Sequence, residues 1–339
     1  MARVAILILN FNGEAHLRRF LPSIISNSQD CDIIIGDNCS TDNSIQLLEK
    51  SFQEVRIIKL EKNYGYAEGY NQLIKQVDND IIALVNSDVE VTKNWTEDLV
   101  KILDSGDKIA AVQPKILSYN NQHQFEYAGA AGGYIDKYGY PFCRGRVFNT
   151  IEEDLGQYND NREVFWASGA CFLVKKAVFE QLGGFDGSFF AHMEEIDLNW
   201  RMHNTGFKVM YCSSSVVYHL GGGTLNYDNP HKTYLNYRNG WCMLVKNLPK
   251  KTRTGILFVR WWLDLLSIIF YASRLQFSNS FAVIRAHFYI LQNFKKIAAI
   301  AADSTNNATI NSSIAPRKFS LVWHYFIKKK KRFSDLIPD

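Results

Sequence analysis

Two adjacent carboxylates, Glu194 and Glu195, stand in the stretch FFAHMEEIDLNWR at 189–201. If a helix begins near Glu194, both lie in its first turn, where the helix dipole favours the ionised form of a carboxylate. An ionised carboxylate at the mouth of a site can accept a proton, so this pair is a candidate general base. Asp197 and Arg201 are four residues apart and can form an ion pair on one face of the same helix. The alternative is an acidic first turn with a solvated ion pair and no chemistry.

Asp88 and His219 are candidate metal ligands. Asp88 follows the apolar run in LVNSDVE at 84–90. Carboxylate oxygen suits hard divalent cations, and imidazole is acceptable to Mn²⁺ but less typical for Mg²⁺. A cation with so few protein ligands usually completes its shell with phosphate oxygens, so the pair predicts Mg²⁺ or Mn²⁺ bridging the protein and a diphosphate. The alternatives are a strand-end cap for Asp88 and a satisfied hydrogen-bonding histidine for His219.

The elements that must position these residues alternate between strand and helix. Continuous apolar runs predict buried parallel strands, and one-sided apolar spacing predicts helices. Strands are predicted at 4–9, 33–35, 55–60 and 81–85, and helices at 14–26, at 43–52 and from the Gly65 loop to about residue 77. This alternation predicts an α/β fold with a doubly wound parallel sheet, in which ligands bind beyond the carboxyl ends of the strands. Asn10, Asp37, Asn63 and Asp88 fall at such ends, so we expect them to converge on one edge.

Fewer helices and strands can be predicted in the second half of the chain. Strands are expected near 110–117 and around 164–174, a helix at 194–205, and strand-like segments at 208–212 and 215–218. The loop with Gly65 and Gly69 follows the third strand, so it is not the dinucleotide-binding fingerprint that follows a first strand.

Composition and charge divide the chain into two parts. A hydrophobic content of 47% over 339 residues supports one large core, with or without appendages. The six cysteines form no CxxC pair, which predicts reduced thiols in a cytosolic protein and excludes a disulfide framework or zinc site. Residues 246–339 hold 16 Lys and Arg against four Asp and Glu, whereas residues 1–245 hold 22 against 30. We expect an acidic domain at 1–245 and a basic, aromatic-rich helical appendage at 246–339.

The appendage has the pattern of a membrane-associating segment. Gly255–Ala272 is an apolar run of 18 residues that Arg260 and Asp264 interrupt. A spanning helix needs about 20 apolar residues and mid-span charges are costly, so we expect an interfacial or docked amphipathic helix. A second is predicted at 281–302, and the basic run Lys328–Arg332 beside aromatic residues favours an anionic membrane surface. The alternatives are a hairpin that packs on the body or mediates a homodimer. No nucleic-acid recognition module is visible, so no nucleic acid partner is expected.

Taken together, the motifs resemble family 2 glycosyltransferases of the GT-A fold, and within them bacterial rhamnosyltransferases that act on cell-surface polysaccharides. They span about residues 3–225 in the family's order. The matching stretches are Asn10-Phe-Asn12, Asp37-Asn38-Cys-Ser40-Thr-Asp42, Asn63-Tyr-Gly65-Tyr66-Ala67-Glu-Gly69-Tyr-Asn71, Asn86-Ser87-Asp88, Trp166-Ala-Ser-Gly169-Ala170, Gly184-Phe-Asp186, Phe190-Ala-His-Met-Glu194-Glu195-Ile-Asp197-Leu198, Arg201 and His219.

The resemblance implies a donor, an acceptor and a set of site residues. The donor is a nucleotide-diphosphate sugar, dTDP-rhamnose-like or a UDP-hexose, and the acceptor is a glycan or lipid-linked glycan at the cytoplasmic, inner face of the plasma membrane. The donor site is assigned to Asn10, Asn12, Asp37, Asn38, Asn63, Gly65, Asn71, Asn86 and Ser87. The acceptor is assigned to Trp166 and Gly169, and Mg²⁺ or Mn²⁺ to Asp88 and His219. The catalytic base is assigned to Glu195, with Glu194 as its alternative.

Two positions depart from the family's pattern. Asn86 stands where the metal-binding DxD motif begins with Asp, so one charge is lost and metal dependence is in doubt. Glu195 stands where the base is usually Asp, which moves the carboxylate by about one C–C bond in a reaction that depends on position. The implied reaction is inverting, with Glu195 taking a proton from an acceptor hydroxyl. These departures motivate the alternative of a catalytically inactive nucleotide-sugar-binding or scaffold protein.

Overall fold

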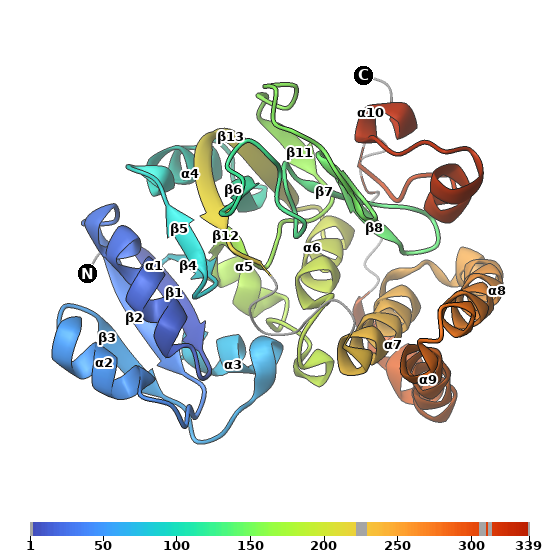
Figure 1. The fold of residues 1–339 in the computed structure, drawn as a ribbon, viewed down its shortest axis with the longest axis horizontal. Helices are drawn as coiled ribbons and strands as arrows, with labels where there is room; N and C mark the ends of the chain where they lie inside the picture. Colours follow the sequence, from blue (N-terminus) through green and yellow to red (C-terminus); the bar gives the residue numbers. More distant parts are fainter. Residues whose placement is uncertain (1–2, 222–228, 305–309, 311–313, 338–339) are drawn as a thin grey trace.

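A nine-stranded sheet runs through the centre of the molecule (Figure 1). The computed structural model describes residues 3–221, 229–304, 310 and 314–337. The strands of the large sheet are β1 Val4–Asn10, β2 Cys31–Asp37, β3 Arg56–Lys59, β4 Ile81–Val85, β5 Val89–Val91, β6 Ile109–Ser118, β11 Arg162–Val164, β12 Cys171–Lys175 and β13 Lys208–His219. They lie in the order β11-β13-β6-β12-β4-β1-β2-β3, and β5 pairs with β13.

The half of the sheet formed by β4, β1, β2 and β3 is parallel, as the apolar runs predict. Side chains alternate along a strand, so Leu7 of β1 enters one core and Ile6 and Ile8 enter the other. One face is covered by α1 Glu14–Ser26, α2 Ser44–Ser51 and α4 Trp95–Asp104, and the other by α3 Gly65–Ile74, α5 Lys176–Gln181 and α6 Glu194–Asn204. The predicted doubly wound arrangement is confirmed, and burial on both faces explains why these strands are apolar throughout.

The other half of the sheet mixes strand directions. β12 is antiparallel to both β4 and β6, and β13 is parallel to β6. β13 is one continuous strand where the sequence predicts two segments. Its pairing with β6 shifts register between Cys212 and Val216. The three serines between these residues interrupt the apolar alternation, which is why the sequence pattern divides the strand.

A small four-stranded sheet and the C-terminal tail pack on each other. The elements are β7 Gly133–Ile135, β8 Pro141–Cys143, β9 Arg146–Val147, β10 Thr150–Ile151, a π-helical turn Trp323–Ile327 and α10 Phe333–Leu336. The ring of Phe333 lies 5.1 Å from that of Tyr134 and 5.9 Å from that of Phe142, between centroids. The Leu321 backbone N–H donates to the Asp136 carboxylate at 2.8 Å. The tail is thus docked on the body.

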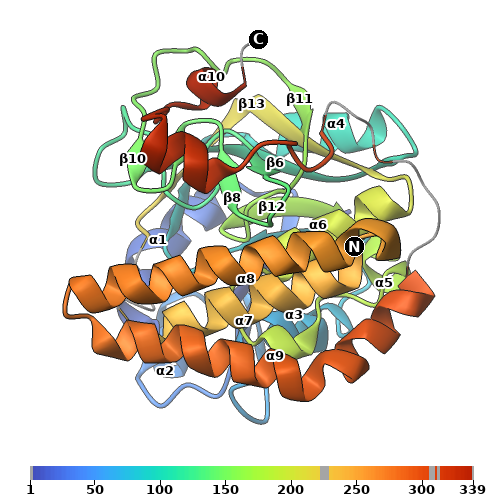
Figure 2. The same cartoon turned by 90° about the vertical axis from the view of Figure 1, so that its right-hand side faces the viewer.

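Three long helices lie side by side at one edge of the molecule (Figure 2). They are α7 Pro230–Asn247, α8 Lys250–Ser273 and α9 Phe277–Ser304. The two helices predicted in the appendage are confirmed as α8 and α9, but α7 is not predicted, because its Gly, Asn, Thr and Tyr residues are weak helix formers. α7 packs against α6 and against α9, so the predicted boundary between residues 245 and 246 falls inside a helix. The division into two domains stays a prediction.

The two charges that interrupt the apolar run of α8 face the body. Asp264 is fully buried and accepts from Arg260 Nε at 2.8 Å, on the same helix. It also accepts from Trp241 Nε1 of α7 at 2.6 Å and from the Tyr140 hydroxyl at 3.2 Å, and its Oδ2 lies 3.2 Å from His287 Nε2 of α9. One carboxylate therefore joins α8 to α7, α9 and the small sheet. The docked helix of the sequence prediction is confirmed on this face.

The opposite face of α8 and α9 is apolar and open to solvent. Of the 20 exposed large hydrophobic side chains among the described residues, 17 lie between Phe258 and Ile327. α8 is, within the described residues, the helix whose length and mean hydropathy of 1.6 would suffice to cross a membrane, and only 17% of its most apolar window is buried. A patch of this extent on a protein surface marks an interaction site.

We predict that Asp264→Ala lowers the free energy of unfolding by about 3–5 kcal/mol, because it leaves the Arg260 guanidinium buried without its carboxylate. Urea denaturation measures the change. Replacing both charges, as Arg260→Met with Asp264→Leu, should recover most of the loss, and the exposed Lys251→Ala should change stability by less than about 0.5 kcal/mol. A single Asp264→Ala variant as stable as the wild type would contradict this account.

Candidate active site

The segment that precedes α6 has a strained backbone. Phe190, His192 and Met193 have φ of 64°, 70° and 71°. Positive φ is uncommon for residues other than glycine and persists where the surroundings impose it. α6 then begins at Glu194, as the sequence predicts. The strained segment turns the chain so that two consecutive carboxylates form the first turn of the helix.

Side chains of α7 hold this segment in place. Asn239 Nδ2 lies 3.0, 2.9 and 2.7 Å from the backbone oxygens of Phe189, Ala191 and His192. Arg238 Nη2 donates to the Phe189 oxygen at 2.8 Å. Sequence reasoning missed both residues because it missed α7. The feature that could have indicated a role for Asn239 is that it is a polar residue among neighbours that are buried in the structure.

A buried carboxylate couples α6 to the end of α7. Asp197 has no exposed area, and it accepts from Arg201 Nε and Lys246 Nζ at 2.9 Å and from Asn247 Nδ2 at 2.8 Å. Burial alone would raise the pKa of Asp197, but the charges of Lys246 and Arg201 outweigh burial and lower it. The predicted pair of Asp197 with Arg201 is confirmed, and the alternative of a solvated pair is wrong.

Glu194 is buried and Glu195 is partly buried, and each has one oxygen without a partner among the described residues. Glu194 is 4% exposed, and neither its Oε2 nor that of Glu195 has a hydrogen-bond partner among the described residues. Burial raises the pKa of Glu195 to about 7. Burial, followed by the neighbouring charge of Glu195, raises the pKa of Glu194 well above its usual value. The expectation that the helix dipole keeps this pair ionised is wrong, because desolvation outweighs the dipole.

Gly169 lies directly beside the Glu195 carboxyl. A Cβ added to Gly169 would stand 3.8 Å from Glu195 Cδ and 3.1 Å from the Tyr66 hydroxyl oxygen. That hydroxyl donates to the Gly169 carbonyl at 2.5 Å. Tyr66 is partly buried near both carboxylates, and burial raises its pKa well above the usual value, so it is a neutral donor. A side chain at Gly169 would therefore crowd the Tyr66 hydroxyl and contact Glu195.

The loop that carries Gly169 is fixed by two amide side chains that sequence reasoning missed. Gln113 Oε1 accepts from the Ser168 backbone N–H at 2.8 Å, and Asn199 Oδ1 accepts from that of Ala167 at 3.1 Å. Asn199 Nδ2 also donates to the Glu195 carbonyl at 2.5 Å. Asn199 thus ties the loop to the first turn of α6.

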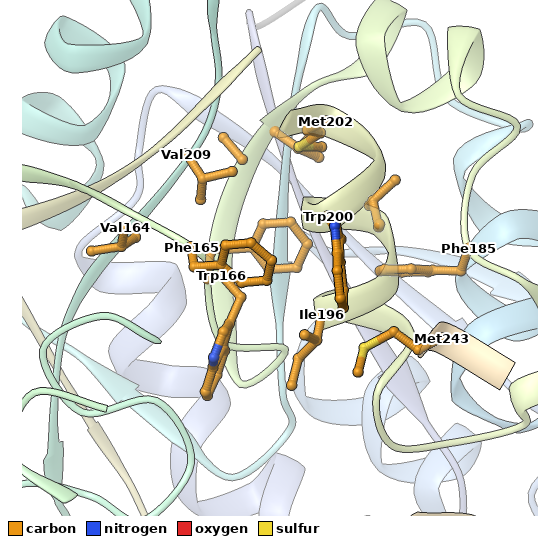
Figure 3. Close-up of a cluster of buried hydrophobic side chains, with 14 of the residues drawn as sticks. Val164, Phe165, Trp166, Phe185, Ile196, Trp200, Met202, Val209 and Met243 are labelled. Atoms are coloured by element: carbon orange, nitrogen blue, oxygen red, sulfur yellow. The ribbon is translucent and has the colours of Figure 1, made fainter. Parts of the chain in front are cut away.

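Trp166, expected to line the acceptor pocket, lies in the core instead. Its side chain is 3% exposed, and Nε1 donates to the Tyr134 carbonyl at 2.9 Å. Figure 3 shows it among buried hydrophobic side chains that include Phe165 and Trp200. A Cβ on Gly133 would come within 2.0 Å of its ring, so the indole packs flat on that glycine. Trp166 supports the site from behind, and we correct the expectation accordingly.

The carboxyl ends of β1 and β2 bring two predicted donor residues together. Asn10 and Asp37 are register partners, and Asn10 Nδ2 donates to Asp37 Oδ1 at 3.2 Å. Asn10 Oδ1 is buried with no hydrogen-bond partner among the described residues. A Cβ on Gly13 would stand 2.4 Å from that oxygen and 3.7 Å from Ser87 Oγ, which places Ser87 at the same edge. Asn12 Oδ1 accepts from the Thr41 backbone N–H at 2.7 Å and holds the loop after β2.

Asn38 organises the glycine loop before α3. Its Nδ2 donates to Asn63 Oδ1 at 3.1 Å and to the Gly65 carbonyl at 3.0 Å. Asn63 Oδ1 also accepts from the Gly65 N–H at 2.8 Å. Asn38 is 2% exposed, so it shapes the pocket rather than lining it.

Asn71 is also a structural bridge. Its Oδ1 accepts from the Phe185 N–H at 3.0 Å and its Nδ2 donates to the Phe185 carbonyl at 2.9 Å and to Glu68 Oε2 at 3.0 Å. Both hydrogens of the amide nitrogen are therefore engaged by the protein, and a contact of Asn71 with a nucleotide stays a prediction.

Asp88 and His219 meet as predicted, and a second carboxylate, Glu126, joins them. His219 Nε2 lies 3.1 Å from Asp88 Oδ1 and 3.5 Å from Asn86 Nδ2, and Nδ1 lies 3.3 Å from Glu126 Oε2. Burial disfavours a charged imidazole, but Glu126 and Asp88 outweigh it and raise the pKa of His219 to about 10. Burial would likewise raise the pKa of Asp88, but His219 outweighs it and lowers that pKa. Glu126 was missed because it lies outside the recognised motifs.

The donor set at Asp88 suits a divalent ion only in part. Within the described residues, no group of three His, Cys, Asp or Glu side chains is arranged to hold a metal. Asp88 and His219 Nε2 face each other, so an ion between them would replace the proton they share. Oxygen ligands from a diphosphate and water would then complete an octahedral shell. The residues present fit a metal that is bound together with its substrate.

Comparison with protein families gives one match that covers more than half of the chain. Residues 5–183 match the model of "Glycosyl transferase family 2". An N-acetylglucosaminyl-diphospho-decaprenol L-rhamnosyltransferase of Mycobacterium tuberculosis is 26% identical over 231 residues, which cover 63% of this chain and 75% of that protein.

Two solved structures share the fold at low sequence identity. GalNAc-T7 with UDP, GalNAc and Mn²⁺ superposes with a TM-score of 0.55 and 16% identity over 73% of this chain, and this chain covers 48% of it. Residues 1–349 of Staphylococcus aureus TarS in complex with UDP-GlcNAc give a TM-score of 0.52 and 14% identity over 94% of this chain and 99% of that one.

We predict that the wild-type protein loses more stability between about pH 5 and pH 8 than its Glu195→Gln variant. The folded state holds the Glu195 proton up to a pKa of about 7, whereas the unfolded chain releases it near 4.5. The unfolded state then binds fewer protons in this window, so the free energy of unfolding falls as pH rises. Urea denaturation across the window measures the difference. Glu54→Gln, an exposed control, should follow the wild type, and equal slopes for all three proteins would refute the assignment.

Proposed function

The chain belongs to glycosyl transferase family 2 and has the GT-A fold, and on that premise we propose an inverting sugar transfer to a hydroxyl group. The donor is a nucleotide-diphosphate sugar, dTDP-rhamnose-like or a UDP-hexose, and the acceptor is a glycan or lipid-linked glycan of cell-surface polysaccharide synthesis. The observation that carries the proposal is Glu195, a partly buried carboxyl with a pKa of about 7, one oxygen unpartnered among the described residues and the side-chain-free Gly169 beside it.

Glu195 is the base in this proposal. A base works best when its pKa lies near the operating pH, which holds for Glu195, whereas burial and the neighbouring charge of Glu195 raise the pKa of Glu194 well above its usual value. Glu195 takes the proton of the acceptor hydroxyl as that oxygen attacks the anomeric carbon. The diphosphate leaves from the opposite face of the sugar, and this inverts the anomeric configuration. Asn199 holds the first turn of α6 that carries this base, and Tyr66 holds the carbonyl of the neighbouring Gly169.

Asp88 and His219 are the residues that would hold Mg²⁺ or Mn²⁺ in this chain. When bound, such an ion neutralises charge on the leaving diphosphate. Glu126 holds the second ring nitrogen of His219 and so fixes the orientation of the ring. Asn10, Asn12, Asp37, Asn63, Gly65, Asn86 and Ser87 are the proposed donor residues, with Asn38 and Asn71 supporting them.

The acceptor class rests on the relative and on the helical face. The Mycobacterium relative is named for a lipid-linked diphosphate sugar, and we propose an acceptor of this kind here. Residues 250–300 hold eight Lys and Arg, of which Arg253 and Arg260 are buried, and a single acidic residue, Asp264, which is also buried. A basic, apolar face matches the anionic inner leaflet of a plasma membrane, so we propose peripheral attachment there. A homodimer through the same face is the alternative.

A donor panel tests the proposed function. We expect one nucleotide sugar to be hydrolysed slowly or to raise the melting temperature, in Mn²⁺ or Mg²⁺ but not with chelator, and Asp88→Ala to lose this response. With an acceptor present, Glu195→Gln should lower kcat by about 10²–10⁴ and abolish the rise of kcat/KM with pH near 7.

Glu194→Gln is the matched control for the base and should keep the pH profile. Full turnover in Glu195→Gln would refute its role. Binding of a nucleotide sugar with no turnover in the wild type, despite acceptor, would favour the inactive binding or scaffold protein that Asn86 and Glu195 motivate.

We also predict that the protein floats with vesicles that contain anionic lipid and sediments away from neutral ones. The double variant Trp261→Ser with Phe288→Ser removes exposed apolar contact and should weaken flotation, because each buried large side chain contributes about 1.5–3 kcal/mol. Leu155→Ser, an exposed residue far from the helices in sequence, is the control. A stable homodimer with no flotation would replace membrane attachment by self-association.

A further inference from the structure

An open cavity lies where α7 and α9 meet. Its volume is about 560 Å³, and its lining combines the apolar rings of Phe277 and Phe281 with the polar side chains of His231 and Arg285. Such a volume suits a ligand of moderate size. The mixed lining suits a ligand that is both charged and apolar.

Aromatic contacts fix the orientation of Arg285, the basic side chain of the cavity. The Arg285 guanidinium lies 4.2 Å from the centroid of the Tyr234 ring, and the His231 ring stacks on the same tyrosine at 6.4 Å. Arg285 has no carboxylate partner among the described residues. An arginine fixed by stacking, and still able to donate, is suited to bidentate binding of phosphate.

An apolar stripe leads away from this cavity along α9. Phe277, Phe281, Ile284, Phe288 and Leu291 follow each other at spacings of four and three residues, so they share one face. The last three line a second cavity of about 170 Å³ with Trp261, Leu265, Ile268 and His287. From Phe277 to Leu291 the helix is about 20 Å long. A cationic end and an apolar track of this length match a phosphate with a hydrocarbon chain.

The other side of the cavity borders the candidate active site. The rings of His231 and Phe190 lie 6.4 Å apart, edge to face. Phe190 is 41% exposed, and a Cβ on Gly65 of the proposed donor site would come within 2.4 Å of its ring. The Phe190 carbonyl accepts from the Tyr66 N–H at 2.6 Å, and Tyr66 in turn contacts Gly169 beside Glu195. One aromatic side chain thus separates the cavity from the donor pocket.

We propose that this cavity binds the diphosphate of a polyprenyl-diphosphate-linked acceptor, with Arg285 and His231 on the phosphates and the hydrocarbon chain along the α9 stripe. The proposal rests on the proposed function, since it names where the acceptor of that reaction enters. The sugar end then lies past Phe190, toward Glu195. Specificity for a lipid-linked acceptor comes from the helical appendage, and donor specificity comes from the sheet edge.

Calorimetry in micelles of a non-ionic detergent tests the site with the full chain. We expect a polyprenyl diphosphate to bind at least about tenfold tighter than the same polyprenol or inorganic diphosphate, and Arg285→Gln to lose about tenfold or more of that affinity. Arg274→Gln is the matched control, since Arg274 is an exposed arginine of the same hairpin, over Phe270, outside both cavities. It should bind as the wild type does.

Three results would overturn the proposal. One is equal affinity of wild type and Arg285→Gln, the second is inorganic diphosphate binding as tightly as the lipid, and the third is equal competition by phosphatidylglycerol. Nucleotide-sugar binding, followed by thermal shift, should be unchanged in Arg285→Gln. If the wild type binds no nucleotide sugar, the proposed function fails, whereas donor binding without an Arg285 effect rejects only the acceptor cavity.

Discussion

The buried carboxylate of Asp197 is the constraint on which the geometry of the site depends. It is taken up by Arg201 of its own helix and by Lys246 near the end of α7. Leaving such a charge without partners would cost about 3–5 kcal/mol, so α6 and α7 are fixed relative to each other. Two helical turns before Lys246, Asn239 then reaches the backbone before α6 and imposes the positive φ values there. The first turn of α6, and with it Glu195, takes its position from a helix that lies outside every recognised motif.

Burial acts on both Glu195 and Asp88, yet the pKa of Glu195 is raised and that of Asp88 is lowered. At Glu195 burial has no compensating cation, so the pKa rises toward neutrality and the group can accept a proton at working pH. At Asp88 burial is outweighed by His219, so the carboxylate stays ionised. When two carboxyl groups have very different pKa values, the one with the higher pKa can take a proton while the other stays negatively charged. Glu126 faces Nδ1 of the His219 ring, on the side away from Asp88.

Sequence periodicity was sufficient for the parallel half of the sheet and for the edge where polar residues gather, but not for the mixed half, where β13 is one strand instead of two. Parallel strands covered on both faces must be apolar, so their ends can be located by where polarity begins. Periodicity was insufficient where the same residue type can either bind a ligand or support the fold. Trp166 and Asn71 have side chains that suit a ligand, yet both are engaged by the backbone of the protein. α7 escaped prediction because its weak helix formers are overridden by packing. The dipole argument for Glu195 failed because desolvation depends on tertiary contacts that no local pattern records.

The position of α7 also sets where this chain could exchange parts with its relatives during evolution. A crossover at residue 245 would separate Lys246 from Asn239. The resulting protein would then have α6 with the buried Asp197 but without Lys246 to pair with it. A crossover at Pro249, which precedes the first residue of α8, keeps α7 with the sheet. The incoming α8 and α9 then need to match the face of α7 that packs on α9, as well as Trp241 and Tyr140, the two partners of Asp264 outside the hairpin. A module exchanged as a unit would therefore begin after α7, so that α6 and the segment before it keep their partners Lys246 and Asn239.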